Sequence, residues 1–589
     1  MSATDAGFLS QQTINAITLS QRIMMNYQFK NLRFLLRMML TVAAFGLTTA
    51  CEATMPVITI TTDTTLNARE KVTAHMTTEG FDGPIGIKLR GNSSLGFNQK
   101  KYTLETRDEK GKEVDVNLLG MPAHSEWVLL APYNDISTMR DPLAFQLWRD
   151  MGHWGPRTVM VELTVDGEYR GIYILCEAIK RGTDRVNISK LKKSSIQGRD
   201  LTGGYLLRID TFNEDDATFT SKLPGIGEGI MSSEVIWSCI YPKKSKLQPE
   251  QLAYIQNYVD TVEQVIQSDD FADPQRGYAR YIDVPSFVDY FIHTELSLNA
   301  DAYRRSAYFY KEKQQEDGSG GKLFAGPVWD YNYAYGNSNL ANASNIESWC
   351  YEGGNNNPTP ALWQRLLQDP AFRKAVKQRY EQLRKGPLSL EKLHAYIDRH
   401  AQLVSNATKH HFQTYPELLV NEEQKKQFEE QRKNGPQGGF PFGGGFPPMG
   451  GGFPPSGEFP SGGGFPPMGD GFPPGGSFPP GGSFPPGGGF PPAGSDSMPD
   501  FQQFSMVNMF AAYRVCSYDE EIAVLKQWLA DRLAFLDRNI ARFDKDWQPR
   551  IQPLIEKKMQ FPGGFPGGGF PGGGFPPGGG FPPGGGFMK

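Results

Sequence analysis

The sequence predicts an α+β fold with two lobes, interrupted and followed by tracts that do not fold. Strand-like patterns come first along the chain and helical patterns come later, an order typical of α+β proteins. Gly and Pro, which number 66 and 44 among the 589 residues, concentrate in 435–499 and 561–589. These FPPGGG-like tracts lack the aliphatic residues of a packed core, and we expect both to be disordered. The rest of the chain is long enough for one large or two moderate domains.

The strand predictions depend on alternating apolar and polar residues and on turn signals. The dipeptide Asp166-Gly167, for example, is typical of a hairpin turn between two strongly β-patterned segments. The predicted strands are Pro56–Thr62, Gly86–Arg90, Tyr102–Thr106, Thr158–Val165, Tyr169–Glu177, Gly203–Asp210, Ser306–Lys311 and Leu323–Trp329.

Helices are predicted between and after these strands, and the first of them stops at Gly152, a usual helix terminator. The predicted helical stretches are Asp135–Met151, Lys246–Ser268, Val284–Leu298, Pro360–Lys433 and Ser517–Phe543. Because the tract 435–499 separates the last two, we expect it to loop out from the folded part. A solvated spacer is the favoured interpretation of the tract. Its regular Phe spacing leaves open a sticky element that binds a cell-wall or matrix partner.

The N-terminal leader, residues 1–51, resembles an export signal. Lys30–Arg37 is basic, Met38–Ala50 is a short apolar run that ends in small residues, and Cys51 follows. This combination is typical of a secretory signal, and the apolar run is too short for a membrane-spanning helix. We expect an exported protein, either a bacterial cell-surface or periplasm-facing lipoprotein attached to the membrane through a lipid on Cys51, or a secreted protein.

Charge and cysteine content exclude several classes of protein. The 60 basic and 64 acidic residues nearly balance, which gives no electrostatic basis for binding nucleic acid. None of the five cysteines belongs to a CxxC pair, so neither a zinc ribbon nor a thioredoxin-like motif is expected. One or two disulfides remain open, with no pairing fixed.

Three segments carry residues suited to phosphate chemistry. In LRGNSSLGFNQKKYTL (89–104), small polar residues at a turn would let backbone N–H groups approach phosphate oxygens, and the following lysines would neutralise charge. An ordinary surface hairpin has a similar pattern. In NADAYRRSAYFY (299–310), Asn299 and Asp301 lie where a helix ends and a strand begins, and they either face a cleft or merely cap the helix.

The third segment, FAGPVWDYNYAYG (324–336), places Asp330 at the exit of an apolar strand. A carboxylate in that position commonly presents an oxygen ligand to Mg²⁺, although a surface Asp that opens a turn has the same pattern. Along the chain, the order of these parts is the phosphate cradle, the lysines, a helix, a hairpin, Asp301 and then Asp330. Phosphoryl transfer needs a phosphate cradle, a cation and two carboxylates, and this is the order of the parts in a protein kinase.

These segments and their order resemble those of the CotH (spore coat protein H) kinase family, and the resemblance runs from about Pro56 to the helices near His400. The segments that carry the resemblance are IKLRGNSSLGFNQKKYTLE, WVLLAPYNDISTMRDPLAFQLWRDMG, ELTVDGEYRGIYILCEAIKRG, GGYLLRID, LNADAYRRSAYFYK and GPVWDYNYAYGN. The resemblance implies a divergent protein-kinase-like fold, with ATP and Mg²⁺ or Mn²⁺ as cofactors and a protein substrate phosphorylated on Ser or Thr. It places a kinase-like domain at 52–434, with an N-lobe at about 56–180 and a C-lobe at about 181–434. We expect a helical segment, 500–560, to pack on this domain.

The resemblance also implies roles for individual residues. Asp301 would be the catalytic carboxylate and Asp330 a metal ligand. The residues expected at the ATP site are Arg90, Asn92, Lys101 (with Lys100 as the alternative), Arg140 from the helix behind the cleft, and Glu177 beside the adenine.

Two positions depart from the kinase pattern. Ser306 stands at the second metal-ligand position, where kinases carry Asn, and Asn332 stands where many relatives have a second Asp. A hydroxyl and an amide are weaker Mg²⁺ ligands than a carboxylate. The alternative to an active kinase is therefore a catalytically weak pseudokinase that acts as a surface adhesin or matrix-binding scaffold.

Overall fold

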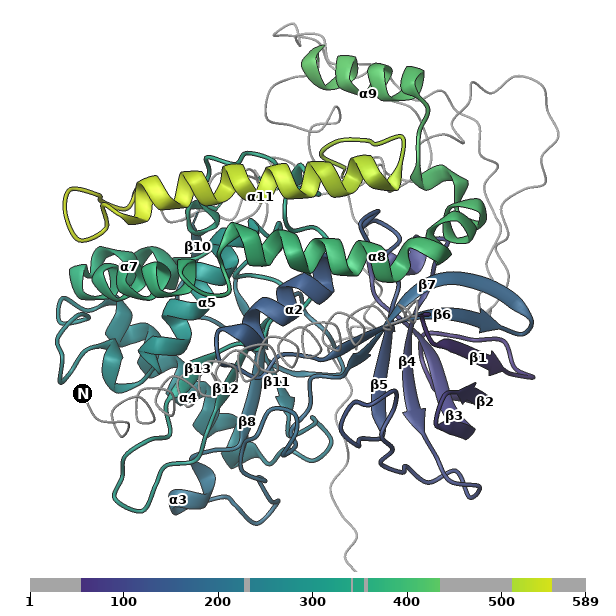
Figure 1. Cartoon of the computed structure of the whole chain (residues 1–589). Helices are drawn as coiled ribbons and strands as arrows, with labels where there is room; N and C mark the ends of the chain where they lie inside the picture. Colours follow the sequence, from purple (N-terminus) through teal and green to yellow (C-terminus); the bar gives the residue numbers. More distant parts are fainter. Residues whose placement is uncertain (1–53, 227–233, 341–342, 354–358, 435–510, 553–589) are drawn as a thin grey trace, which may run out of the picture.

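The computed structural model describes residues 54–226, 234–340, 343–353, 359–434 and 511–552 (Figure 1). The predictions for the leader 1–51, the tract 435–499 and the tail 561–589 lie outside these residues. Of the predicted helical segment 500–560, residues 511–552 are described.

Seven strands in the first part of the chain close into a barrel. Their order is β1-β2-β3-β4-β5-β7-β6, and a parallel pairing of β1 with β6 closes the ring. All other neighbouring strands in the barrel are antiparallel. The strands are β1 (Val57–Thr61), β2 (Val72–Thr78), β3 (Phe81–Arg90), β4 (Lys101–Thr106), β5 (Glu126–Leu130), β6 (Thr158–Val165) and β7 (Glu168–Glu177).

Apolar and polar residues alternate along these strands, and the apolar side chains fill the inside of the barrel. In β1, Ile58 and Ile60 are fully buried while their neighbours are exposed, as expected for a strand with one face inside. Trp127 and Tyr173, both fully buried, add large rings to the same core. Helix α2 (Arg140–Asp150) lies between β5 and β6 in the chain and packs outside the barrel, in the core of the helical part.

A second, five-stranded sheet has the order β13-β12-β8-β11-β9. Its strands are β8 (Tyr205–Ile209), β9 (Ala217–Thr220), β11 (Ile236–Tyr241), β12 (Ala307–Lys311) and β13 (Leu323–Ala325), and β10 (Gly225–Ile226) pairs separately with β14 (Thr359–Pro360). The helices of this part are α3 (Gly198–Leu201), α4 (Pro249–Gln267), α5 (Val284–Ser297), α6 (Ala361–Gln368), α7 (Pro370–Arg384), α8 (Leu390–Thr414), α9 (Glu422–Asn434) and α11 (Tyr518–Ile540).

Helix α11 belongs to this helical core although 435–510 separate it from α9. Figure 1 shows it, in yellow, running alongside α8, and it also contacts α5 and α7. Leu525, Leu529 and Leu536 are fully buried and belong to one apolar cluster with α5 and α8. The sequence pattern explains this, because apolar residues recur every three or four positions along the helix.

The predicted α+β class is confirmed, and the structure refines the elements. The helix predicted from Asp135 begins at Arg140, whose N–H donates to Asp135 Oδ2 in the preceding buried loop at 2.8 Å. The strand predicted over Leu323–Trp329 ends at Ala325, before Pro327, which has no N–H to donate to a sheet. Within the described residues no helix is both long and apolar enough to cross a membrane, and Cys176, Cys239, Cys350 and Cys516 are free thiols.

Candidate active site

Asp301 lies in a loop between α5 and β12. Asp283 caps the start of α5, where its side chain accepts the Ser286 N–H at 3.0 Å, and Leu298, with φ 44°, ends the helix in the left-handed region. Asn299 follows and connects two loops. Its Oδ1 accepts the Asp301 N–H at 3.2 Å, and its Nδ2 donates to the carbonyl of Asp330 at 3.2 Å. The loops that carry the two predicted carboxylates are therefore side by side.

Asp330 follows a buried, extended segment after β13. Its φ is 66°, a left-handed conformation that is uncommon for a residue with a side chain. Its side chain is 35% exposed, and Lys101 Nζ lies 3.7 Å from Oδ1. Lys101 starts β4 and pairs in register with Arg90 at the end of β3, and the Arg90 guanidinium lies 5.5 Å from the centre of the Trp329 ring. Arg90, Lys101 and Asp330 thus meet where the barrel faces the helical part.

The electrostatics of Asp301 link it to the same cluster. Burial raises the pKa of Asp301, the charges of Arg305 and Arg304 lower it, and the charges of Asp330 and Asp210 raise it. Arg305 lies 3.5 Å from Asp301. The net result is a raised pKa, which makes the Asp301 carboxylate a better acceptor for a proton from a hydroxyl.

Ser306 faces a carboxylate that the sequence analysis did not select. Its Oγ donates to Asp210 Oδ2 at 3.4 Å, and its φ is 48°. Strand β8 pairs with β12 so that Ile209 lies opposite Ala307, and this register brings Asp210 beside Ser306. The available signal was an Asp at the exit of a buried strand, the same signal that identified Asp330. The pairing of β8 with β12 was not predicted.

Asn332, the second departure from the kinase pattern, points into the protein. It is buried, and its Nδ2 donates to Asn134 Oδ1 at 2.9 Å. Asn337 then donates to the carbonyls of Asn134 and Asn332, each at 2.7 Å. These bonds fix the conformation of the chain after Asp330.

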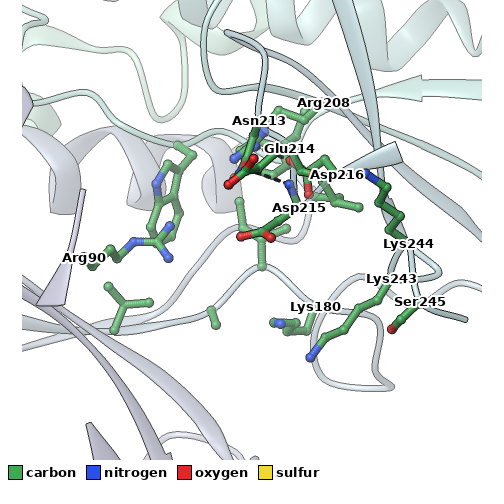
Figure 2. Close-up of a pocket in the computed structure, with 16 residues that line it drawn as sticks. Arg90, Lys180, Arg208, Asn213, Glu214, Asp215, Asp216, Lys243, Lys244 and Ser245 are labelled. Carbon is green, nitrogen blue, oxygen red and sulfur yellow. Dashed lines mark hydrogen bonds and ion pairs between the residues drawn. The ribbon is translucent and has the colours of Figure 1, made fainter. Parts of the chain in front are cut away.

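A cavity of about 650 Å³ lies beside the cluster (Figure 2). One part of its lining consists of Arg90, Val128 and Trp329. Another part consists of residues 178–180, where the chain leaves β7. Figure 2 shows Arg90 across the cavity from the loop 213–216 and from Lys243 and Lys244. Apolar and charged groups of both signs therefore surround a space large enough for a nucleotide.

The other predicted site residues lie outside this cluster. Asn92 is exposed at the turn after β3, and Lys100 Nζ donates to the carbonyl of Leu95 at 2.7 Å. Arg140 is fully buried and bonded to Asp135 and other groups of the protein. Glu177 is also fully buried, adjacent in sequence to Ala178 of the cavity, and it accepts hydrogen bonds from Arg157 and Arg185.

The donors at the cluster fit a hard divalent cation. In nucleotide enzymes Mg²⁺ usually takes one or two carboxylates and completes its shell with water and phosphate oxygens. Asp330, with Asp301 or Asp210, supplies that kind and number of ligands. Among the described residues, no group of three or more His, Cys, Asp or Glu side chains forms a metal site made by the protein alone.

Two comparisons show which known proteins the chain is similar to. A family model described as CotH kinase protein matches residues 87–434. The chain is also similar to the inner spore coat protein H of Bacillus subtilis (strain 168), at 21% identity over 311 residues, which covers 52% of this chain and 73% of that protein. The cluster of Arg90, Lys101, Asp210, Asp301 and Asp330 lies inside the matched span, and α11 lies outside it.

Proposed function

The chain belongs to the CotH kinase protein family, and from that premise we propose that it is an ATP- and divalent-metal-dependent protein kinase that phosphorylates Ser or Thr of secreted or surface proteins. In this proposal the barrel is the N-lobe of a divergent kinase and the helical part with its five-stranded sheet is the C-lobe. The observation that carries the proposal is the meeting of Lys101, Asp330 and Asp301 beside one cavity between these parts.

The nucleotide would lie in the cavity of Figure 2, with its base against residues 178–180 and its phosphates toward Arg90 and Lys101. The short distance between Lys101 Nζ and Asp330 supports this orientation. The positive charge of Lys101 suits the phosphates and the negative charge of Asp330 suits the cation, and phosphates and cation must lie together. Asp330 would hold Mg²⁺ or Mn²⁺. A cation held there would supply positive charge to offset the negative charge of the phosphate oxygens during transfer.

Asp301 would orient the substrate hydroxyl and accept its proton as the oxygen attacks the γ-phosphorus and the bond to the ADP oxygen breaks. Its raised pKa suits this role, and Asn299 holds its loop against the Asp330 loop. Lys101 and Arg90 would stay paired with the phosphate oxygens through the transfer.

The test is transfer of labelled phosphate from ATP to casein by the full chain, with Mg²⁺ and with Mn²⁺, beside Asp301→Asn and Asp330→Asn. We expect transfer by the wild type and none above background by either variant. Binding of ADP with the metal, measured by calorimetry, should weaken in Asp330→Asn and persist in Asp301→Asn. Equal transfer by all three proteins would exclude the assignment.

A second candidate is a catalytically weak pseudokinase that serves as a surface adhesin or matrix-binding scaffold. Two observations favour it: the Ser306 hydroxyl faces Asp210, and the Asn332 amide is bonded to Asn134. Nucleotide binding without transfer to casein or to the chain itself would support this candidate.

Export and surface attachment also belong to the proposal. The leader pattern before Cys51 supports export with a lipid on that cysteine, and the FPPGGG-like tracts would then reach toward the cell wall or matrix. Metabolic labelling with a fatty acid, compared between wild type and Cys51→Ser, tests the lipid.

A further inference from the structure

Helix α11 lies directly behind the two loops that carry the candidate catalytic carboxylates. It follows 435–510 in the chain and lies beyond the span matched by the family model. It inserts two charged side chains, Glu521 and Arg532, which are 1% and 0% exposed. Buried charges are costly unless they are paired and hydrogen-bonded, so their contacts indicate what the helix does.

Glu521 connects α11 to the loop that follows Asp330. Its Oε1 lies 2.7 Å from an NH group of Arg140. The same guanidinium donates from Nε to the carbonyl of Ala334 at 3.0 Å and from its other NH group to that of Tyr335 at 3.5 Å. Arg140 therefore connects a carboxylate of α11 to the backbone just beyond Asp330.

Trp528, two turns further along α11, packs against the same loop. Its ring meets Tyr335 edge to face at 6.0 Å between centroids. Gly336 has φ 77°, and a Cβ added there would lie 2.4 Å from Trp528 Cδ1. The loop thus approaches the helix so closely that only glycine fits.

Arg532 connects α11 to the loop that carries Asp301. Its Nε donates to the carbonyl of Glu295 at 2.9 Å, and a guanidinium nitrogen lies 3.7 Å from Glu295 Oε2. Glu295, on α5, accepts the hydroxyl hydrogen of Tyr303 at 3.0 Å, and Tyr303 is fully buried two residues after Asp301. Arg532 also donates to the carbonyl of Ser348 at 2.7 Å.

We propose that α11 is a positioning element of the phosphoryl-transfer site, in which Glu521 and Trp528 hold the Asp330 loop and Arg532 holds the Asp301 loop. The inference rests on the proposed function of Asp301 and Asp330. None of the three α11 residues touches the reacting groups, so each acts through another residue. The competing explanation is a helix that only adds buried apolar surface. That explanation predicts general loss of stability without loop-specific effects.

The activity test compares each buried α11 charge with a more exposed charge on the same helix. Glu521→Ala is matched by Glu520→Ala, whose carboxylate instead pairs with Lys425. Arg532→Lys is matched by Arg538→Lys, which pairs with exposed Glu347. Lysine keeps the Arg532 charge but cannot reproduce its several fixed donors. We expect kcat to fall roughly 10- to 100-fold in the Glu521 and Arg532 variants, with the KM for ATP nearly unchanged, and no change in the matched variants.

If Glu521→Ala does not fold, the isosteric Glu521→Gln, which keeps an acceptor for Arg140, replaces it. Equal kcat in the α11 variants and their matched controls would overturn the proposal.

Hydrogen exchange provides a readout that does not require activity. Without nucleotide, Glu521→Ala should speed exchange in 330–338, and Arg532→Lys should speed it in 299–306, with the barrel strands unchanged. If exchange became faster throughout the protein, or did not become faster in either loop, α11 would have a merely structural role. A wild-type chain that transfers no phosphate would contradict the proposed function, while the exchange result would still decide whether α11 positions the loops.

Discussion

Two groups of acidic side chains lie on opposite sides of the same loops. Behind the loops, Glu521 and Glu295 are 1% and 0% exposed, and each faces an arginine. In front, the side chains of Asp301, Asp330 and Asp210 are 20%, 35% and 16% exposed. Asp301, Asp330 and Asp210 have cationic neighbours as well, because Arg305, Lys101 and Arg208 lie 3.5, 3.7 and 3.4 Å from them.

The difference separates charges that hold the structure from charges kept for a ligand. The rear carboxylates have their arginines at fixed positions in a dry environment, where removing one partner leaves an uncompensated charge. The front carboxylates repel one another and are partly exposed, so they keep capacity for a metal ion or a substrate hydroxyl. Substitutions in front should therefore alter chemistry, and substitutions behind should alter stability and loop position.

The largest effect is expected from Asp330→Ala and Asp301→Ala. Each should lower phosphoryl transfer by several orders of magnitude, because on the proposed function each removes a group that acts on the reacting atoms. The melting temperature should stay within a few degrees of wild type, since both side chains are partly exposed. Asp317→Ala, in an exposed loop, is the control and should retain full activity. Autophosphorylation at the wild-type rate in both variants would place the chemistry elsewhere.

The next largest effect, on stability, is expected at the buried ion pair of Arg532 and Glu295 behind the loops. Arg532→Met leaves the Glu295 carboxylate buried without its cation and should cost about 3–5 kcal/mol of unfolding free energy. Arg538→Met removes an exposed pair with Glu347 and should cost less than about 1 kcal/mol. Chemical denaturation of the two variants measures both. A similar cost for the two would show that burial does not distinguish these ion pairs.

Acid should lower the stability of the folded chain through His400, which is buried behind the loops. Burial lowers the pKa of His400 from 6.5 to about 4, and its Nε2 lies 3.2 Å from Thr138 Oγ1, near Asp135 and Arg140. Between these two values the unfolded chain binds a proton that the folded chain does not, so stability falls as the pH drops from 6.5 to about 4. His400→Gln should remove this part of the loss, worth up to roughly 3 kcal/mol. If the free energy of unfolding of wild type and of His400→Gln changed with pH in the same way over that range, His400 would not contribute.

A smaller effect is expected at Ser306, in the front group. Ser306→Asn would restore the side-chain oxygen that kinases place there, and Asn tolerates the left-handed backbone of this position. We expect the wild type to work better with Mn²⁺ than with Mg²⁺, and Ser306→Asn to narrow the difference by improving the use of Mg²⁺. Metal titrations at saturating ATP measure this. Equal Mg²⁺ dependence in the two proteins would remove Ser306 from the metal site.

The smallest effect should follow deletion of 435–499, with a short linker in its place. The composition of this tract gives it little apolar surface to bury, so the melting temperature should change by no more than a few degrees. Loss of about 10 °C or more, measured by calorimetry, would show that the tract is packed.

Sequence patterns predicted what is local in this molecule. The alternation in β1, the hairpin at Asp166-Gly167 and the carboxylate at the end of an apolar strand depend on neighbouring residues, and the segments that carry Asp301 and Asp330 were identified in this way. What depends on long-range pairing was not predicted. The parallel contact of β1 with β6 closes the barrel, and the pairing of β8 with β12 brings Asp210 to Ser306.

Arg140 shows the same limit for a single residue. Its position in a helix was predicted from local pattern and its place behind the cleft from the family resemblance, but its partner Glu521 lies hundreds of residues away, beyond the tract. No periodicity in either segment indicates that contact, because two buried charges of opposite sign are compatible with many partners.

Because α11 lies late in the chain, it determines when the candidate site can be assembled during synthesis of the protein. A chain is made from its N-terminus, and its earlier parts can fold before its end exists. A nascent chain that has already delivered β1 to α8 still lacks Glu521, Trp528 and Arg532 until the ribosome has passed through 435–510. On the proposed role of α11, such a chain can fold most of its core without assembling a working site, so activity begins only after α11 has been made.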